Sequence, residues 1–261
     1  MKELLATAMA LAEDAGKYIR ESASRFGQVG YKGRADLVTD VDRKAEEIIL
    51  SGIKKAYPDH AVLAEESGES PARSDFRWVV DPIDGTTNFV HGYPFFCVSI
   101  AVQHRLETVA AVVLNPMAGE LFTALKGQGA RLNGIPIAVS TTTELSRALV
   151  ATGFPYRLGE RWQHSMRLFE AFYLNSHGVR RDGAAALDLC YVAAGRFDGF
   201  WEYELQPWDV AAGLLIVREA GGMVTDFQEQ PSGIADRQVL ASNGRIHGEM
   251  LKIIKSQVQG I

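Results

Sequence analysis

The sequence predicts a mixed α/β fold in which helices and sheets stack in layers. The first half of the chain reads as two amphipathic helices followed by a run of short segments rich in β-branched and aromatic residues. The second half alternates strand-like and helix-like segments. With 261 residues and 47% hydrophobic composition, the chain can bury a full core. We therefore expect layers of both kinds of structure in a single domain over residues 1–261, with a soft internal seam near residue 145.

Two helices are expected at the start of the chain. Apolar residues between positions 4 and 19 recur at helical spacing, and a second apolar stripe runs over residues 45–56. Pro58 follows this stripe and ends the second helix. Thr39, with Asp42 three residues later, resembles a capping arrangement at its start.

A largely antiparallel sheet is expected next. Its strands are short and separated by Gly, Pro or Asn: AVLAEE, FRWVVD, FFCVSIAV, TVAAVVLNP, GELFTAL and a last short strand PIAVS. The second half then predicts the strands ALVATGF, GVRR, FDGFWE, MVTDF and QVLASN. Helices are expected at ERWQHSMRLFEAFY, AAALDLCYVAAG, DVAAGLLIVREAGG and around MLKIIKSQV.

Composition narrows the class of function. The net charge is −5, with acids and bases interspersed, so nucleic acid is an unlikely primary partner and a small molecule fits better. No apolar run approaches the roughly 18 residues of a membrane span, and the N-terminus lacks the pattern of a signal peptide. We expect a soluble cytoplasmic protein. Cys97 and Cys190 lie in apolar segments and are expected to be buried and reduced.

The stretch DPIDGTTNF, from Asp81 to Phe89, fits neither an ordinary strand nor an ordinary helix. Pro82 has no N–H for a sheet ladder and would disrupt a helix interior. We therefore expect the chain to turn here. Gly85, Thr86 and Thr87 then offer successive backbone N–H groups, and such clusters of amides bind phosphate.

Four acidic groups lie at the edges of predicted elements. They are Asp36, Asp40 and Asp42; Glu65 and Glu66; Asp81 and Asp84; and Asp209. Most have a purely structural alternative: Asp42 as a helix N-terminal carboxylate, the two glutamates as a solvated strand end, and Asp209 as a helix cap. Asp81 is harder to explain, because it ends an apolar strand, where an unpaired carboxylate is costly.

A metal ion is the simplest counter-charge for Asp81. No Lys or Arg lies between Trp78 and Gln103, so a neighbouring cationic side chain would have to come from elsewhere in the fold. An all-oxygen set without His or Cys spacing favours a hard cation such as Mg²⁺ over zinc. Bridging carboxylates suit a two-metal site, and with the turn of amides they predict a phosphomonoester hydrolase in which metal-activated water attacks.

Four blocks of the sequence resemble the inositol monophosphatase family. They are DLVTDVDRKAEE, AEESGE, DPIDGTTNFVHGYPFFCVSIAV and WDVAAGLLIVREAGG, which occur in the family's order over essentially the full length. GFWEYELQPWD is similar to the bacterial members. The resemblance implies a layered α-β-α-β-α sandwich, as in the fructose-1,6-bisphosphatase type. It also implies a homodimer that hydrolyses small phosphate monoesters with Mg²⁺ and is often inhibited by Li⁺.

The resemblance also implies a metal set and a catalytic set. By motif position, Glu65, Asp81 and the carbonyl of Ile83 hold the first Mg²⁺, and Asp81, Asp84 and Asp209 hold the second. Glu65 also faces a third, weaker ion. The family's catalytic residues correspond to Glu65, to Asp42 and to Thr86, the last two activating the attacking water. The amides of Gly85 and Thr86 form the phosphate cradle.

For the substrate's ring, the resemblance implies contacts from Asp84, the amide of Ala185 and Glu202. Ala184, in the stretch DGAAA, lacks a hydroxyl often found in the family, so the exact alcohol stays open. Lys32 corresponds to a lysine near the entrance, with a solvated surface cation as an equal alternative.

The resemblance implies hydrolysis of inositol 1-phosphate to inositol and phosphate. One alternative keeps the chemistry and changes the substrate to fructose 1,6-bisphosphate, histidinol phosphate, an adenosine bisphosphate or another polyol phosphate. Another is a protein of a transcription complex that retains phosphatase activity.

Overall fold

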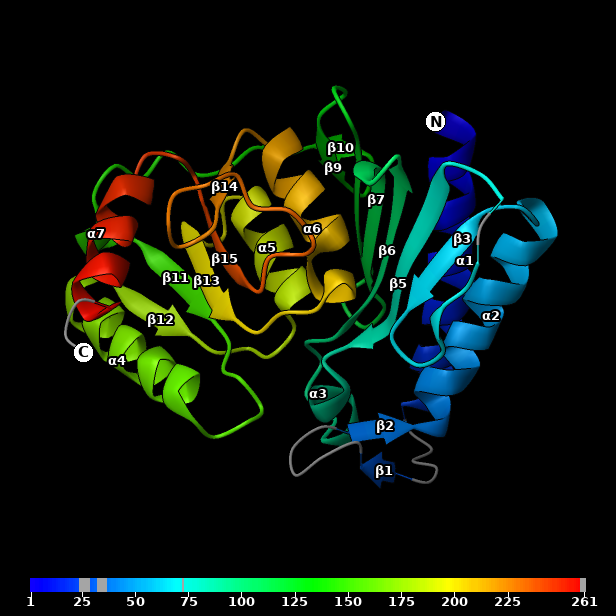
Figure 1. Ribbon diagram of the computed structural model, residues 1–261, viewed down its shortest axis with the longest axis horizontal. Helices are drawn as coiled ribbons and strands as arrows, with labels where there is room; N and C mark the ends of the chain where they lie inside the picture. Colours follow the sequence, from blue (N-terminus) through cyan, green and yellow to red (C-terminus); the bar gives the residue numbers. More distant parts are fainter. Residues whose placement is uncertain (24–28, 32–36, 72, 259–261) are drawn as a thin grey trace.

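The chain folds into alternating layers of helix and sheet. The computed structural model describes residues 1–23, 29–31, 37–71 and 73–258, so Lys32 and Asp36 lie outside the described residues. In Figure 1 the layers run from α1 and α2, through an eight-stranded sheet, α5 and α6, and a five-stranded sheet, to α4 and α7. The predicted α-β-α-β-α sandwich is confirmed. The helices are α1 (Lys2–Ser22), α2 (Asp40–Ala56), α4 (Glu160–Asn175), α5 (Ala185–Ala193), α6 (Pro207–Glu219) and α7 (His247–Val258).

The eight-stranded sheet is antiparallel except where β3 pairs with β5, which confirms the expected character of the first half. Its order is β10-β9-β8-β7-β6-β5-β3-β4. The strands are β3 (Ala61–Ala64), β4 (Gly68–Glu69), β5 (Phe76–Asp84), β6 (Cys97–His104), β7 (Glu107–Asn115), β8 (Glu120–Leu125), β9 (Ala130–Leu132) and β10 (Ile135–Pro136). A separate two-stranded sheet pairs β1 (Val29–Tyr31) with β2 (Leu37–Thr39) in the antiparallel sense.

The predicted strand PIAVS is wrong beyond Pro136. Only Ile135 and Pro136 belong to β10. The amide of Val139 instead donates to the carbonyl of Ala220, at the end of α6, with an N···O distance of 3.1 Å. The chain leaves the sheet because its backbone is hydrogen-bonded to the helical layer.

The turn predicted within Asp81–Phe89 is present, but the expectation that no strand passes through Pro82 is wrong, since β5 continues to Asp84. Asp81 pairs with Ser99 and Asp84 with Cys97, so β5 holds one extra residue between these pairs, which is a β-bulge. A bulge accommodates a proline, which cannot donate to the ladder. The turn comes at Gly85, whose φ of 97° is in the region that favours glycine. The short helix α3 (Thr86–Val90) follows.

The five-stranded sheet has the order β12-β11-β13-β15-β14. Its strands are β11 (Leu149–Thr152), β12 (Gly178–Arg180), β13 (Gly199–Tyr203), β14 (Met223–Thr225) and β15 (Gln238–Ser242). β11 is parallel to β12 and β13, and β15 is antiparallel to β13. The C-terminal ends of β11, β12 and β13 therefore share one edge with the start of β15.

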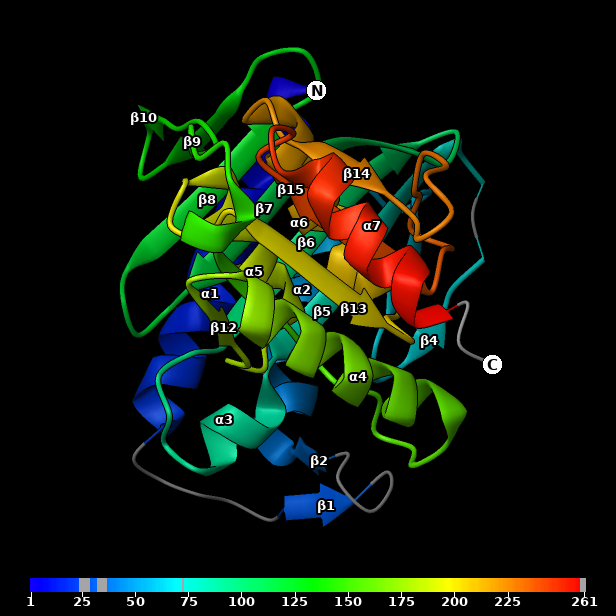
Figure 2. The ribbon, with the colours of Figure 1, turned by 90° about the vertical axis from the view of Figure 1, so that its left-hand side faces the viewer.

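Three apolar cores fill the spaces between the layers. One core lies between α1, α2 and the larger sheet and includes Trp78 and Ile100. The largest surrounds α5 and α6 between the two sheets. The third lies beneath α4 and α7, which cover the outer face of the five-stranded sheet in Figure 2. There the rings of Phe172 and Trp201 stack with centroids 3.9 Å apart.

Two other expectations can be compared with the structure. Cys97 and Cys190 are buried and free, as predicted. Among the described residues, no helix is both long and apolar enough to cross a membrane. The single domain over residues 1–261 stays a prediction, although the short turn η1 (Leu145–Arg147), near the expected seam, connects the strands of the two sheets.

Candidate active site

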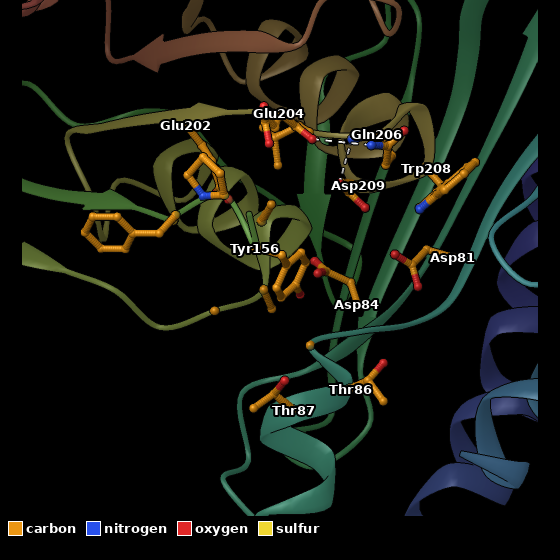
Figure 3. Close-up of a pocket in the computed structure, with 18 of the residues that line it drawn as sticks. Asp81, Asp84, Thr86, Thr87, Tyr156, Glu202, Glu204, Gln206, Trp208 and Asp209 are labelled. Carbon is orange, nitrogen blue, oxygen red and sulfur yellow. Dashed lines mark hydrogen bonds between the residues drawn. The ribbon is translucent and has the colours of Figure 1, made fainter. Parts of the chain in front are cut away.

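A pocket of about 640 Å³ is lined by residues of both sheets. In the view of Figure 3, Asp84 is drawn between Tyr156 and Asp81, and Asp209 lies above them; all four residues line the pocket. The pocket brings together most of the residues expected from the sequence: Glu65, Asp81, Ile83, Asp84, Gly85, Thr86, Ala185, Glu202 and Asp209. Asp42 does not line it, but reaches it through a hydrogen bond from Thr86.

Asp81 is the most unusual acid of the pocket. Its side chain is 2% exposed, and its Oδ1 atom has no hydrogen-bond partner among the described residues. Burial raises the pKa of Asp81 well above its ordinary value, and repulsion from Glu65, Asp84 and Asp209 adds to the rise. A buried oxygen with no donor, next to three other acids, is costly unless a cation neutralises it.

Asp84 lies at the end of β5, just past the bulge. Its Oδ2 atom accepts a hydrogen bond of 2.7 Å from the amide of Ala186, in the first turn of α5. Burial raises the pKa of Asp84 to about 7, even though amide hydrogen bonds from α5 act in the opposite direction. Asp84 therefore joins the end of β5 to the start of α5, and it also lines the pocket.

Asp209 combines two roles that the sequence presented as alternatives. Its carboxylate accepts a hydrogen bond of 2.7 Å from the amide of Gln206, so it does cap α6. It also lines the pocket, and burial together with repulsion from Asp84 raises the pKa of Asp209 well above its usual range. The cap places this acid across the pocket from β5 (Figure 3).

Glu202 lies further along the pocket, on β13. Burial raises the pKa of Glu202 to about 8, despite the opposing charge of Arg181. Gly153 packs directly against it, because a Cβ atom there would lie 2.1 Å from the Glu202 Oε1 atom. Sequence reasoning missed this glycine, since the contact joins two strands that are far apart in the chain.

Asp42 and Thr86 form a hydrogen-bonded pair between α2 and α3. The Thr86 hydroxyl donates to Asp42 Oδ1 over 2.9 Å, and it also lies 3.1 Å from the carbonyl of Ile83. The other Asp42 oxygen accepts from the amide and the hydroxyl of Thr39, which confirms the predicted capping box. Burial raises the pKa of Asp42 while the Thr39 hydrogen bonds oppose the rise.

Two positioning residues escaped the sequence analysis. Glu46, one helical turn after Asp42 on α2, is 4% exposed and accepts a hydrogen bond of 2.9 Å from the amide of Glu66. Asn88 donates to the carbonyls of Phe95 and Asp182, each over 2.7 Å. The spacing of four residues on one helix face could have indicated Glu46. Nothing local could have indicated the partners of Asn88.

The acids fit a hard cation in their chemistry. They are oxygen donors, and the unpartnered Oδ1 of Asp81 is an unused ligand atom. Within residues 1–23, 29–31, 37–71 and 73–258, no three or more acidic, histidine or cysteine side chains are already grouped closely enough to hold an ion.

The layered sandwich, with an acidic pocket beside a turn of amides, defines the class of α/β phosphatases. The sequence pattern of the inositol monophosphatase family matches residues 1–259, and the chain belongs to this family. Its members are generally metal-dependent.

Proteins similar to this chain carry different names. The chain is 46% identical over 257 residues to the inositol-1-monophosphatase of Synechocystis, covering 98% of this chain and 89% of that protein. It is 44% identical over 248 residues to the Nus factor SuhB of Vibrio cholerae, covering 94% and 93% of the two chains. The crystal structure of the extragenic suppressor protein suhB from Bartonella henselae superposes with a TM-score of 0.93 at 42% identity, covering 99% of this chain and 100% of that one.

Proposed function

We propose that the protein is a Mg²⁺-dependent phosphatase that hydrolyses inositol 1-phosphate to inositol and phosphate. The observation that carries the proposal is the buried, unpartnered Oδ1 of Asp81 at the centre of an acidic pocket. Without a cation, this arrangement only destabilises the fold. With one, it concentrates positive charge beside the turn at Gly85, where a phosphate can bind.

The metal set is proposed from motif position and pocket chemistry together. Glu65, Asp81 and the carbonyl of Ile83 would hold one ion, and Asp81, Asp84 and Asp209 would hold another. Glu65 would also face a third, weaker ion. Bound Mg²⁺ supplies charge for the phosphate oxygens and for the leaving group, and makes water a stronger nucleophile.

The chain itself supplies the proton path. Because the Thr86 hydroxyl donates to Asp42, its own oxygen is left free to accept a proton from water. A proton leaving the water is taken up at Thr86 Oγ1, while the Thr86 proton moves to Asp42 Oδ1. The raised pKa of Asp42 makes this carboxylate a better proton acceptor than an exposed aspartate. The amides of Gly85 and Thr86 would donate to phosphate oxygens.

The alcohol part of the substrate would lie toward the five-stranded sheet. Asp84, the amide of Ala185 and Glu202 line that part of the pocket and would bind ring hydroxyls. With a pKa of about 8, Glu202 can donate as well as accept a hydrogen bond at neutral pH. Fructose 1,6-bisphosphate, histidinol phosphate and other polyol phosphates are the alternative substrates, because all present hydroxyl or amino groups near a phosphate ester.

The second candidate function is binding within a transcription complex. Relatives of 43 and 44% identity are named Nus factor SuhB, and this observation favours it. Catalysis and binding are compatible. The expected homodimer, lithium sensitivity and cytoplasmic location stay predictions.

A panel of phosphate monoesters assayed with and without Mg²⁺ tests the proposal. We expect phosphate release from inositol 1-phosphate that depends on Mg²⁺ and is lost in Asp84→Asn. No release from any ester would overturn the phosphatase proposal. Rescue of a deletion phenotype by Asp84→Asn, despite lost hydrolysis, would favour the binding function.

A further inference from the structure

Several arginines line the pocket where strands of the five-stranded sheet begin or end. Arg157 follows β11, Arg181 follows β12, and Arg237 immediately precedes β15; all three line the pocket. The sheet order places the ends of these strands on the same edge. The pocket therefore has an arginine-bearing wall as well as the acids of β5.

The arginines differ in whether an acid already neutralises them. Arg181 acts on Glu202 and Asp188, where its charge opposes the rise in pKa. Arg161, near the same edge, pairs with Glu204 over 3.2 Å. Arg157 and Arg237 are exposed and make neither an ion pair nor a side-chain hydrogen bond with any other residue that the structure describes.

Arg157 and Arg237 flank the position expected to bind the substrate's hydroxyls. β13, which carries Glu202, lies between β11 and β15. Neighbouring strands are about 4.8 Å apart, so β11, which leads to Arg157, and β15, which begins directly after Arg237, are separated by about 10 Å. Arginine side chains are long enough to close on one group across that distance.

Resting on the proposed function, we infer that the pocket binds a second anionic group of the substrate, a carboxylate or phosphate, between Arg157 and Arg237. The substrate class is then a sugar or polyol phosphate whose far end is negatively charged. Arginine is suited to this role because its planar donors match carboxylate and phosphate oxygens. The volume of about 640 Å³ leaves room for such an extended molecule.

Three compounds that share one ring test the inference. Glucose 1-phosphate has a neutral group at its sixth carbon, glucuronic acid 1-phosphate has a carboxylate there, and glucose 1,6-bisphosphate has a phosphate. We expect kcat/KM with Mg²⁺ to be about tenfold higher for at least one of the anionic compounds, mainly through a lower KM. Comparing kcat/KM for the two anionic compounds shows whether a carboxylate or a phosphate binds better between the two arginines.

The double variant Arg157→Gln and Arg237→Gln should bring the three kcat/KM values to within about twofold of one another. Arg147→Gln is the matched control, because Arg147 is exposed, pairs with Glu144 and does not line the pocket. It should keep the wild-type ranking. The inference is overturned if the wild-type protein has equal kcat/KM values for the three compounds. It is also overturned if kcat/KM falls by the same factor for all three compounds in the double variant.

Calorimetric titration of the three compounds in Ca²⁺ buffer separates this inference from the proposed function. Absence of turnover on every ester would overturn the phosphatase proposal alone. The inference requires tighter binding of an anionic compound than of glucose 1-phosphate, and loss of that difference in the double variant. Equal affinities would overturn it whether or not the protein is a phosphatase.

Discussion

The two sides of the pocket are built in different ways. The acidic side comes from β5 and its short turn, with α2 behind it, and its aspartates Asp42, Asp81 and Asp84 are buried. The opposite side comes from the ends of several strands of the five-stranded sheet. Tyr156 there is 62% exposed, and Arg157 is exposed as well. We interpret the first side, together with Asp209 from α6, as the chemical machinery, and the strand ends of the five-stranded sheet as the part that selects the substrate.

Asp81→Asn should have the largest effect on activity. It removes a central charge of the acidic side, and we expect kcat/KM to fall by at least about a thousandfold. Because the wild-type carboxylate is buried without a donor to Oδ1, the variant should melt at a higher temperature than the wild type in Mg²⁺-free buffer. Thermal unfolding with and without Mg²⁺ measures this. A lower melting temperature without Mg²⁺, together with unchanged turnover, would contradict our account of Asp81.

Thr86→Val tests the proton path on the same side. The substitution keeps the volume but removes the hydroxyl that donates to Asp42, so kcat should fall by about a hundredfold with a small change in KM. Thr87→Val is the matched control, since Thr87 is the exposed neighbour in the same turn. Similar losses in the two variants would show that the hydroxyl of Thr86 has no special role.

Glu46→Ala tests whether α2 positions the acidic loop. It removes the acceptor for the Glu66 amide, beside Glu65, and should raise the Mg²⁺ concentration for half-maximal activity by about tenfold. Calorimetric titration of Mg²⁺ should show the same weakening. Glu46→Gln keeps an acceptor oxygen and should restore the wild-type value. Equal weakening in both variants would point to the charge of Glu46 instead.

His247 should affect stability but not the pocket. It lies in the buried region of α7, between the hydroxyls of Thr225 and Ser242, each 2.9 Å from a ring nitrogen. Burial lowers the pKa of His247 to about 4 from its ordinary 6.5. Between these values the unfolded chain binds the proton and the folded chain does not. The free energy of unfolding should therefore fall by about 3 kcal/mol as the pH drops from 6.5 to 4.

Denaturant titrations across this pH range measure that loss. In His247→Asn, most of this fall in the free energy of unfolding between pH 6.5 and 4 should disappear. His177 is an exposed histidine in the same half of the chain, so His177→Asn should show the same fall as the wild type. If the free energy of unfolding fell equally with pH in all three proteins, His247 would not be the group responsible. Mg²⁺ affinity at neutral pH should be equal in all three, which would separate stability of the outer layer from chemistry of the pocket.

The acidic side was largely predictable from the sequence because its residues are close together. Asp81, Asp84, Gly85 and Thr86 lie within one short run, and Thr39 with Asp42 forms a local capping box. Even here, the expectation that no strand passes through Pro82 was wrong. A β-bulge depends on pairing with β6, which the composition of β5 does not reveal.

The substrate side was less predictable because its residues come from separate strands. Glu202 was found only through the family resemblance, and the close packing of Gly153 against it was missed. Arg157 and Arg237 gave no signal, since isolated arginines in loops are usual at a protein surface. Only the strand order brings them to one edge.

The central claim is that the four pocket acids close around divalent cations. The most direct test is a crystal structure with Mn²⁺ in place of Mg²⁺ and with phosphate, using anomalous scattering to locate the metal. We predict anomalous peaks within bonding distance of Glu65, Asp81, Asp84 and Asp209, with phosphate at the amide of Gly85. Full Mn²⁺ occupancy elsewhere, with these acids still apart, would contradict the claim.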